Sequence, residues 1–251
     1  MSRVILPFSN PLSYPGRAPG FDPSHVASRG IGPNRGISAI ATFSNVMVSL
    51  SGSGTSAASI AEPVDSLIGP VVGSAGGINF TGQSTASISA KTLAGIFRVT
   101  SLTGSYQNLI QDNFADALLI QPAENLSFYA SGDSPIPNPA ALVAGRAYFV
   151  AASASGTKIN CVVVDLATGR IYLNSVSEGT GLNAPSGTIE FDNGSAASFA
   201  AGMVGYNYLS LQQLQQWAQD PWSFWYPRTL DLSMMLKSGS IADILYAQAL
   251  L

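Results

Sequence analysis

The fold of this chain is decided by a stretch in its second half, Val162-Val163-Val164-Asp165-Leu166-Ala167-Thr168-Gly169-Arg170-Ile171-Tyr172-Leu173. Two runs of aliphatic, β-branched and aromatic residues flank a centre, Asp165 to Gly169, that holds residues favouring tight turns. Two such runs around a short turn predict a β-hairpin.

Similar short segments recur from residue 37 to about residue 208. They alternate apolar with small or polar residues, which is the pattern of a half-buried strand, and turn-forming residues separate them. The expected strands are 37–43, 46–50, 78–80, 86–90, 95–99, 118–120, 126–129, 147–152 and 159–164. No helical pattern alternates with them, so the sequence predicts an all-β fold, a sandwich or jelly roll, over residues 37–228.

One expected helix lies near the end of this region. Ser210 with Gln213 three residues on is a capping-box pattern, and the apolar residues that follow share one helical face up to Asp220-Pro221. The aromatic residues just beyond are Trp222, Trp225 and Tyr226. These rings allow two interpretations: they anchor the helix and the turn on the sandwich, or they form an open platform on which a sugar ring stacks.

Residues 1–36 differ from the rest of the chain. They hold six of the 15 prolines and no regular apolar period, which predicts an extended arm. Four arginines against one acid give the arm a side-chain charge of +3, so residues 37–251 carry −6 of the chain total of −3. The arginines, which we expect at contacts between subunits, are Arg3, Arg17, Arg29 and Arg35. The arm either wraps its own body or docks on an acidic neighbour.

A second expected helix lies in a C-terminal tail, residues 229–251. It begins at Ser240, with Asp243 three residues on, and carries an apolar stripe. Such a stripe has to be buried on the body or on a partner. The stripe residues that we expect at contacts between subunits are Ile244, Leu245 and Leu251.

Composition disfavours several classes of protein. Charged residues make up 10% of the chain, against about 25% in an ordinary domain, and a net charge of −3 provides no basic field for nucleic acid. One cysteine, Cys161, and one histidine, His25, are too few for an internal disulfide or a zinc module. No motif indicates a metal or a cofactor. No membrane span of about 20 apolar residues and no secretory signal is recognisable.

Paired carboxylates suggest no catalytic site. The closest acids, Asp112 with Asp116 and Glu190 with Asp192, are expected at surface turns or strand edges. A glycosidase needs two carboxylates about 5–10 Å apart in a cleft. We therefore expect that the chain is not an enzyme and assign no catalytic residue.

Three segments resemble a known family. Residues 201–227, with the turn Asp220-Pro221-Trp222, resemble the closing strand, short helix and DPW turn of concanavalin A-like (laminin G-like) jelly rolls in structural proteins of tailed bacteriophages. Residues 142–151 are similar to the family's strand after a Gly-Arg turn, and residues 165–170 to its hairpin. The resemblance covers roughly residues 37–228, between the arm and the tail.

The resemblance implies a structural component of a tailed-phage virion, assembled in the host cytoplasm. We expect a capsid decoration or cement protein that stabilises the shell through its arm and tail. Its expected partners are the major capsid protein or other virion subunits, and copies of itself in a homo-oligomer such as a trimer; nucleic acid and membrane are not expected. The alternative is a carbohydrate-binding module of a head fibre or tail tip used in host attachment. A lectin-fold hydrolase, the third alternative, needs a cleft with paired acids.

Overall fold

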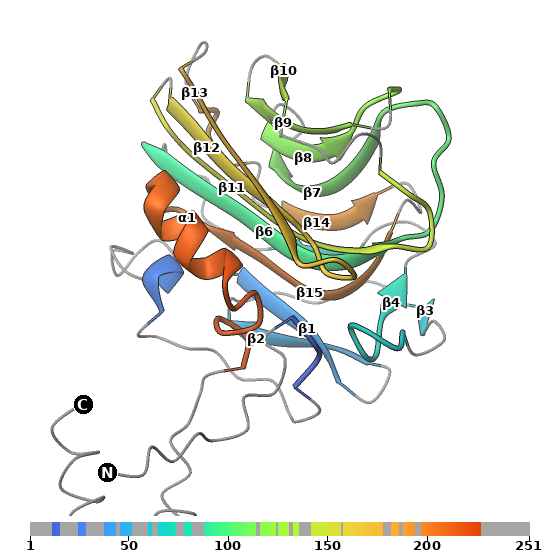
Figure 1. Cartoon of the computed structure of the whole chain (residues 1–251). Helices are drawn as coiled ribbons and strands as arrows, with labels where there is room; N and C mark the ends of the chain where they lie inside the picture. The colour runs from blue at the N-terminus through green and yellow to red at the C-terminus, as the bar shows by residue number, and fades with distance from the viewer. Residues whose placement is uncertain are drawn as a thin grey trace, which may run out of the picture.

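The computed structural model describes residues 12–15, 25–28, 38–43, 46–51, 60–61, 65–73, 78–81, 88–113, 116–123, 125–130, 133–135, 142–156, 158–177, 182–185, 188–193 and 197–226. Their strands form two antiparallel sheets that pack face to face (Figure 1). The described residues add one α-helix, α1 (Leu211–Ala218), and one 3-10 turn, η1 (Val26–Ser28). The predicted all-β sandwich with a short helix near its end is confirmed.

The larger sheet contains nine strands. Seven of them follow the order β13-β12-β11-β6-β15-β1-β2, and the short pair β3 and β4 joins through β15. Their bounds are β13 (Arg170–Ser177), β12 (Lys158–Asp165), β11 (Ala147–Ser155), β6 (Ala90–Val99), β15 (Ala197–Gly205), β1 (Ser38–Phe43), β2 (Val46–Ser51), β3 (Ile60–Ala61) and β4 (Val72–Gly73).

The smaller sheet contains six strands in the order β10-β9-β8-β7-β14-β5. Their bounds are β10 (Asp133–Pro135), β9 (Leu126–Ala130), β8 (Asp116–Ile120), β7 (Gln107–Asn113), β14 (Thr188–Asn193) and β5 (Ile78–Thr81). Strands β7 and β14 were not predicted. Both strands are rich in Gln, Asn, Asp or Glu. Because Asn, Asp and Glu are depleted in strands, the residue types of these two segments do not indicate a strand.

The hairpin that decides the fold forms as predicted. Strands β12 and β13 pair along their whole length. In the turn, Asp165 Oδ1 accepts hydrogen bonds from the backbone N–H groups of Ala167 (3.0 Å) and Thr168 (3.2 Å). Gly169 has a φ of 71°, in the left-handed region, where a side chain would be strained. The local chemistry of Asp and Gly therefore sets the register of the two strands.

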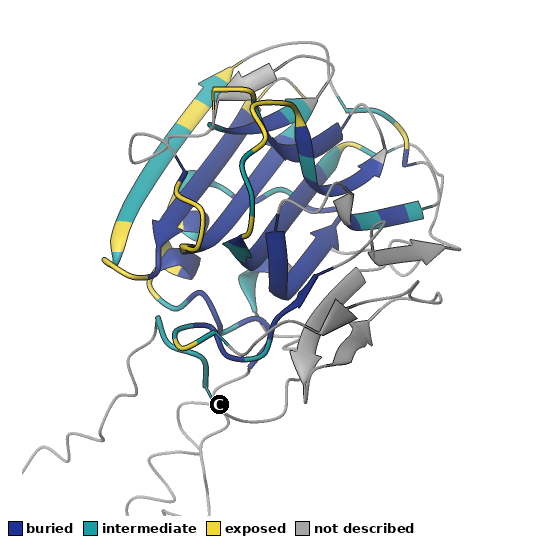
Figure 2. Cartoon of the chain, turned by 90° about the vertical axis from the view of Figure 1, so that its right-hand side faces the viewer, coloured by how far each residue is buried: buried dark blue, intermediate teal, exposed yellow. Residues whose placement is uncertain are grey.

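The space between the sheets is mostly apolar. Its aromatic members are Phe97, Phe128, Tyr148, Phe191, Phe199 and Tyr206. Cys161 lies among them, and burial raises the pKa of its thiol to about 12, so the thiol stays protonated at neutral pH. Cys161 therefore acts as a small buried apolar residue. Figure 2 shows how completely the central strands are buried.

The opposite face of the larger sheet is buried too. Helix α1 lies against this face, on the side turned away from the smaller sheet (Figure 1). The sheet residues beneath it and the following turn include Ile96, Phe149, Val162, Val164 and Met203. The larger sheet is thus apolar on both faces, which explains the near-continuous apolar runs of β11 and β12.

Several expectations fall outside the described residues. These are the contact residues Arg3, Arg17, Arg29, Arg35, Ile244, Leu245 and Leu251, together with the expected tail helix. Within the described ranges, no helix has the length and apolar character to cross a membrane.

Candidate functional site

The segment from α1 to Tyr226 builds an aromatic layer on the larger sheet. We call this layer the aromatic cap; its members are Trp217, Trp222, Phe224, Trp225 and Tyr226. The helix that starts it has the predicted capping box: Ser210 Oγ accepts from the Gln213 N–H (3.3 Å), and Gln213 Oε1 accepts from the Ser210 N–H (2.8 Å). The box fixes where the helix begins and hence which residues face the sheet.

The indole rings of the cap are tied to the backbone. Trp217 packs on Phe149 of β11, with ring centroids 5.3 Å apart, and its Nε1 donates to the Pro221 carbonyl (3.2 Å). Trp225 Nε1 donates to the Gly202 carbonyl of β15 (3.1 Å). Each buried indole N–H therefore has an acceptor, as a buried donor requires.

The cap does not offer an open platform to a ligand. Trp222, Trp225 and Tyr226 are 2%, 0% and 2% exposed. Stacking on a sugar needs a ring face that is open to solvent, and these faces are occupied by other side chains. The structure agrees with the other interpretation, in which the aromatic residues anchor the helix and turn on the sandwich.

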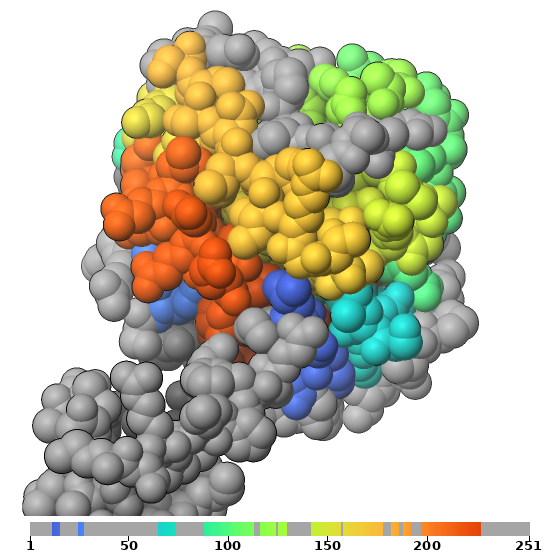
Figure 3. All heavy atoms as spheres, viewed as in Figure 1, coloured from blue at the N-terminus to red at the C-terminus, as the bar shows by residue number. Residues whose placement is uncertain are grey.

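The N-terminal segment 12–15 completes the cap. Tyr14 packs edge-on against Trp222 and Tyr226, both with ring centroids 5.7 Å away. Trp222 Nε1 donates to the Leu12 carbonyl (3.3 Å). We call Leu12, Tyr14, Trp222 and Tyr226 the anchoring pole. In Figure 3 this N-terminal part, in blue, lies beside the helix and turn, in orange and red.

A second N-terminal segment, 25–28, also packs on the body. His25 Nδ1 accepts from the Ala27 N–H (3.1 Å), so its other nitrogen carries the proton in the neutral ring and donates to Ser223 Oγ (3.2 Å). Ser223 Oγ in turn donates to the Asp220 carbonyl (2.7 Å). The ring lies 4.9 Å from that of Trp217. The single histidine is therefore a link between the arm and the cap.

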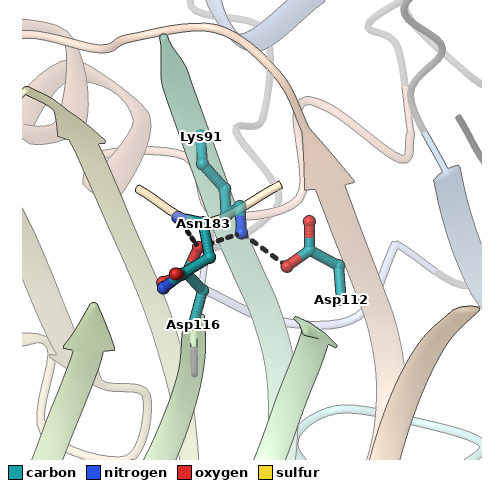
Figure 4. A network of polar contacts seen from close by, with 4 residues as sticks. All are labelled: Lys91, Asp112, Asp116 and Asn183. Carbon is teal, nitrogen blue, oxygen red and sulfur yellow. Dashed lines mark hydrogen bonds and ion pairs between the residues drawn. The ribbon is translucent and has the colours of Figure 1, made fainter. Parts of the chain in front are cut away.

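A cluster of charges lies between the two sheets, on the inner face. We call Lys91, Asp112, Asp116 and Asn183 the ionic cluster (Figure 4). Lys91 Nζ of β6 lies 2.6 Å from Asp112 Oδ1 of β7 and 2.7 Å from Asp116 Oδ2 of β8. All three charged side chains are 0% exposed. One ammonium group thus bridges two carboxyl groups inside the sandwich.

Asn183 closes the cluster from the connection between β13 and β14. Its backbone N–H donates to Asp116 Oδ2 and its side-chain amide to Asp116 Oδ1, both at 2.9 Å. Burial raises the pKa of Asp112, although Lys91 opposes this shift. Burial also raises the pKa of Tyr206, with the Asp112 carboxylate as the next cause. In the part of the chain that is described, no three His, Cys, Asp or Glu side chains are grouped to hold a metal ion.

The placement of Asp112 and Asp116 at the surface was wrong. The signal that could have corrected it is the alternation in β6, where Leu93, Phe97 and Val99 face the inner core. Residue 91 has the same parity, so Lys91 had to point inward and needed acidic partners there. Those partners sit on strands β7 and β8, of which β7 was not predicted.

The outer face of the smaller sheet carries a row of polar side chains. Asn108 Nδ2 donates to Gln111 Oε1 (2.8 Å), and Gln111 Nε2 donates to Glu190 Oε2 on the paired strand β14. Glu190 is half-buried and points away from the core, because Ile189 and Phe191 on either side of it are core residues. We call Asn108, Gln111 and Glu190 the polar row.

Comparison with known proteins identifies only distant similarity. No protein-family model and no curated protein matches the chain. Among solved structures, a Trypanosoma rangeli sialidase complex is 14% identical, with 84% of this chain and 37% of that chain covered and a TM-score of 0.49. The enzymatically active domain of bacteriophage CBA120 tailspike protein 2 is also 14% identical, with 76% and 31% covered and a TM-score of 0.47. The chain thus spans about a third of these proteins.

The expectation that the chain is not an enzyme is corrected. The solved structures to which the chain is similar include sialidases and a tailspike domain described as enzymatically active. The expectation also relied on acids at the surface, whereas Asp112 and Asp116 meet in the interior. The structural matches also include the full-length tailspike protein 2 of the same phage.

Proposed function

We propose that this chain is a structural subunit of a tailed-phage virion, and specifically a capsid decoration protein. The observation that carries the proposal is the anchoring pole. Residues 1–11 join the body at Leu12 and residues 227–251 follow Tyr226, so both segments connect to the sandwich through one aromatic cluster. Two attachment segments that start at the same place on the body can reach the same neighbouring subunit.

Charge supports an attachment role for the basic segment. The arm carries +3 and the rest of the chain −6, so copies of the chain, or another acidic subunit, offer complementary surfaces. The described pieces of the arm, 12–15 and 25–28, pack on their own body. This favours self-wrapping for those pieces. The proposed role of the arginines is contact with a neighbouring subunit. The proposed partners are the major capsid protein and further copies in a homo-oligomer.

Imaging of intact particles at side-chain resolution tests this proposal. We expect copies on the shell, with Arg3, Arg17, Arg29 or Arg35 beside acidic groups of adjacent subunits. Replacing these four arginines by Ala should lower the number of bound copies per particle, whereas Arg170→Ala, at an exposed position of β13, should not. Absence of the protein from the shell, or a purified monomer in which both end segments are rigid, would contradict the proposal.

A second candidate function is binding of host-surface carbohydrate at a fibre or tail tip. The two half-buried members of the polar row, Asn108 and Glu190, favour it, because amide and carboxylate groups can exchange hydrogen bonds with sugar hydroxyls. Binding of host-envelope polysaccharide that is lost in Glu190→Ala and kept in Arg170→Ala would support this candidate. The same samples should be assayed for hydrolysis of the polysaccharide, which would show whether a bound sugar is also cleaved.

A further inference from the structure

In the ionic cluster an amine and two carboxyl groups lie together, and none of the three side chains is exposed to solvent. Lys91, Asp112 and Asp116 come from three strands, β6, β7 and β8, and their side chains are 0% exposed. They lie between two sheets whose inner faces are mostly apolar. Charged groups that lose their hydration in this way are retained only when they are paired, and a neutral arrangement of the same atoms is favoured.

We propose that Lys91 and Asp112 join through an amide bond between their side chains, formed within the folded chain with Asp116 as the proton acceptor. This proposal concerns the interior of the sandwich and does not rest on the proposed function. The bond would be a covalent link between the larger sheet, through β6, and the smaller sheet, through β7.

The geometry places the reacting groups beside each other. Lys91 Nζ is hydrogen-bonded to Asp112 Oδ1 at 2.6 Å, so the nitrogen lies next to the carboxyl group whose carbon it would attack. The second acid, Asp116, contacts the same nitrogen at 2.7 Å. Paired strands on both sides hold these groups in place, which supplies the proximity that speeds reactions between bound groups.

The two acids have different surroundings, and this assigns their roles. Both oxygens of Asp116 already accept hydrogen bonds from Asn183, which hold this carboxylate as an acceptor. Burial raises the pKa of Asp112, which favours its neutral acid form. A neutral carboxylic acid is the better electrophile of the two, because its hydroxyl can leave as water. Asp112 is therefore assigned as the group attacked and Asp116 as the base.

The reaction balances without any co-reactant. A proton passes from the Lys91 ammonium to Asp116, and the neutral amine attacks the Asp112 carboxyl carbon to form the C–N bond. The C–O bond to the Asp112 hydroxyl then breaks. The hydroxyl and a second proton from the nitrogen leave together as one water molecule. Asp116 ends as a neutral acid. The initial charges of +1 and −1 are gone, so no ion remains buried.

Mass spectrometry of the purified full-length chain tests the proposal. We expect an intact mass under denaturing conditions that is lower than the sequence mass by one water. After proteolysis, the peptide that contains residue 91 should be found joined to the one that contains residue 112. The full sequence mass with two separate peptides would overturn the proposal. A link from Lys91 to Asp116 would overturn the assignment of the two acids.

Variants test whether the mass loss comes from a reaction between these side chains. Lys91→Met and Asp112→Leu should abolish the mass loss, and Asp116→Asn should slow it strongly, because the base is gone while the shape is kept. Lys158→Ala, at an exposed lysine of β12, is the control and should keep the mass loss. An unchanged rate in Asp116→Asn would refute the role of Asp116. If a variant does not fold, the mass of the unaltered chain still decides the proposal.

Discussion

The aromatic cap and the ionic cluster lie on opposite faces of the same sheet and are stabilised in different ways. Both are buried, and β6 contributes to both, with Ile96 facing the cap side and Lys91 facing the cluster. In the cap, neutral rings fill volume and each indole N–H meets a backbone carbonyl. In the cluster, one side-chain nitrogen contacts two carboxyl groups. Removing a side chain from the cap leaves a void, whereas removing one from the cluster leaves a buried polar group without its partner.

The largest expected effect is the loss of a cap ring. Trp217→Ala should lower the free energy of unfolding by about 4–5 kcal/mol, since it removes a fully buried indole and leaves a cavity against Phe149. Denaturant unfolding measures this change. Gln216→Ala, at an exposed position of the same helix, is the matched control and should change stability little. A loss below about 1 kcal/mol for Trp217→Ala would mean that the cap is not a structural layer.

Removal of the central ammonium should come next. Lys91→Met should cost about 3–4 kcal/mol near neutral pH, because it leaves two buried carboxyl groups without the nitrogen that contacts both. Lys158→Met, at an exposed lysine, should cost less than about 0.5 kcal/mol. Equal losses in the two variants would show that the cluster contributes nothing beyond surface charge.

The Lys91→Met variant should also show a distinctive pH dependence. Burial holds the pKa of Asp112 above its ordinary value of 3.8. Between pH 3.8 and that raised pKa, the folded state keeps a proton that the unfolded state releases. The free energy of unfolding should therefore fall as the pH rises through this window and level off above it. Adding Asp112→Leu to the variant should flatten this slope, and a slope that persists would assign it to another group.

A smaller effect is expected where the arm meets the body. Gly69 has a φ of +76°, and a Cβ added there would lie 2.5 Å from the Tyr14 ring. Gly69→Ala should cost about 2 kcal/mol, from backbone strain and displacement of the ring. Gly104→Ala is matched, with a φ of +69° and nothing within 4 Å, and should cost about 1 kcal/mol from strain alone. Equal costs would show that Tyr14 moves aside freely.

The smallest effect concerns the helix cap. Ser210→Ala removes the acceptor for the Gln213 N–H and should cost about 1 kcal/mol in chemical unfolding. Ser210→Asp keeps an acceptor at the cap and should restore most of that stability. If the Asp variant is as unstable as the Ala variant, packing of α1 rather than capping determines where the helix begins.

The cap was predictable from the sequence, and the ionic cluster was not. Ser210, Gln213 and the apolar residues after them form a local pattern, so the helix and its buried face follow from neighbouring positions. The hairpin around Gly169 is local in the same sense. The partners of Lys91 lie 21 and 25 positions away, on strands of the other sheet. Their meeting depends on the register of β7, whose polar residues concealed it as a strand.

The contact between Leu12 and Trp222 also has a consequence for how the protein is made. These residues are 210 positions apart, and Ala27 and Asn207 are joined across 180. A ribosome produces the N-terminal segments long before the surface on which they dock. The N-terminal segments can dock only after Trp222 has been made, and the hairpins of the intervening chain can form first. Contacts of such high sequence separation are slow to close. The anchoring pole is thus completed only after Trp222 and Tyr226 have been synthesised, so a copy that stops before them has no pole through which to attach.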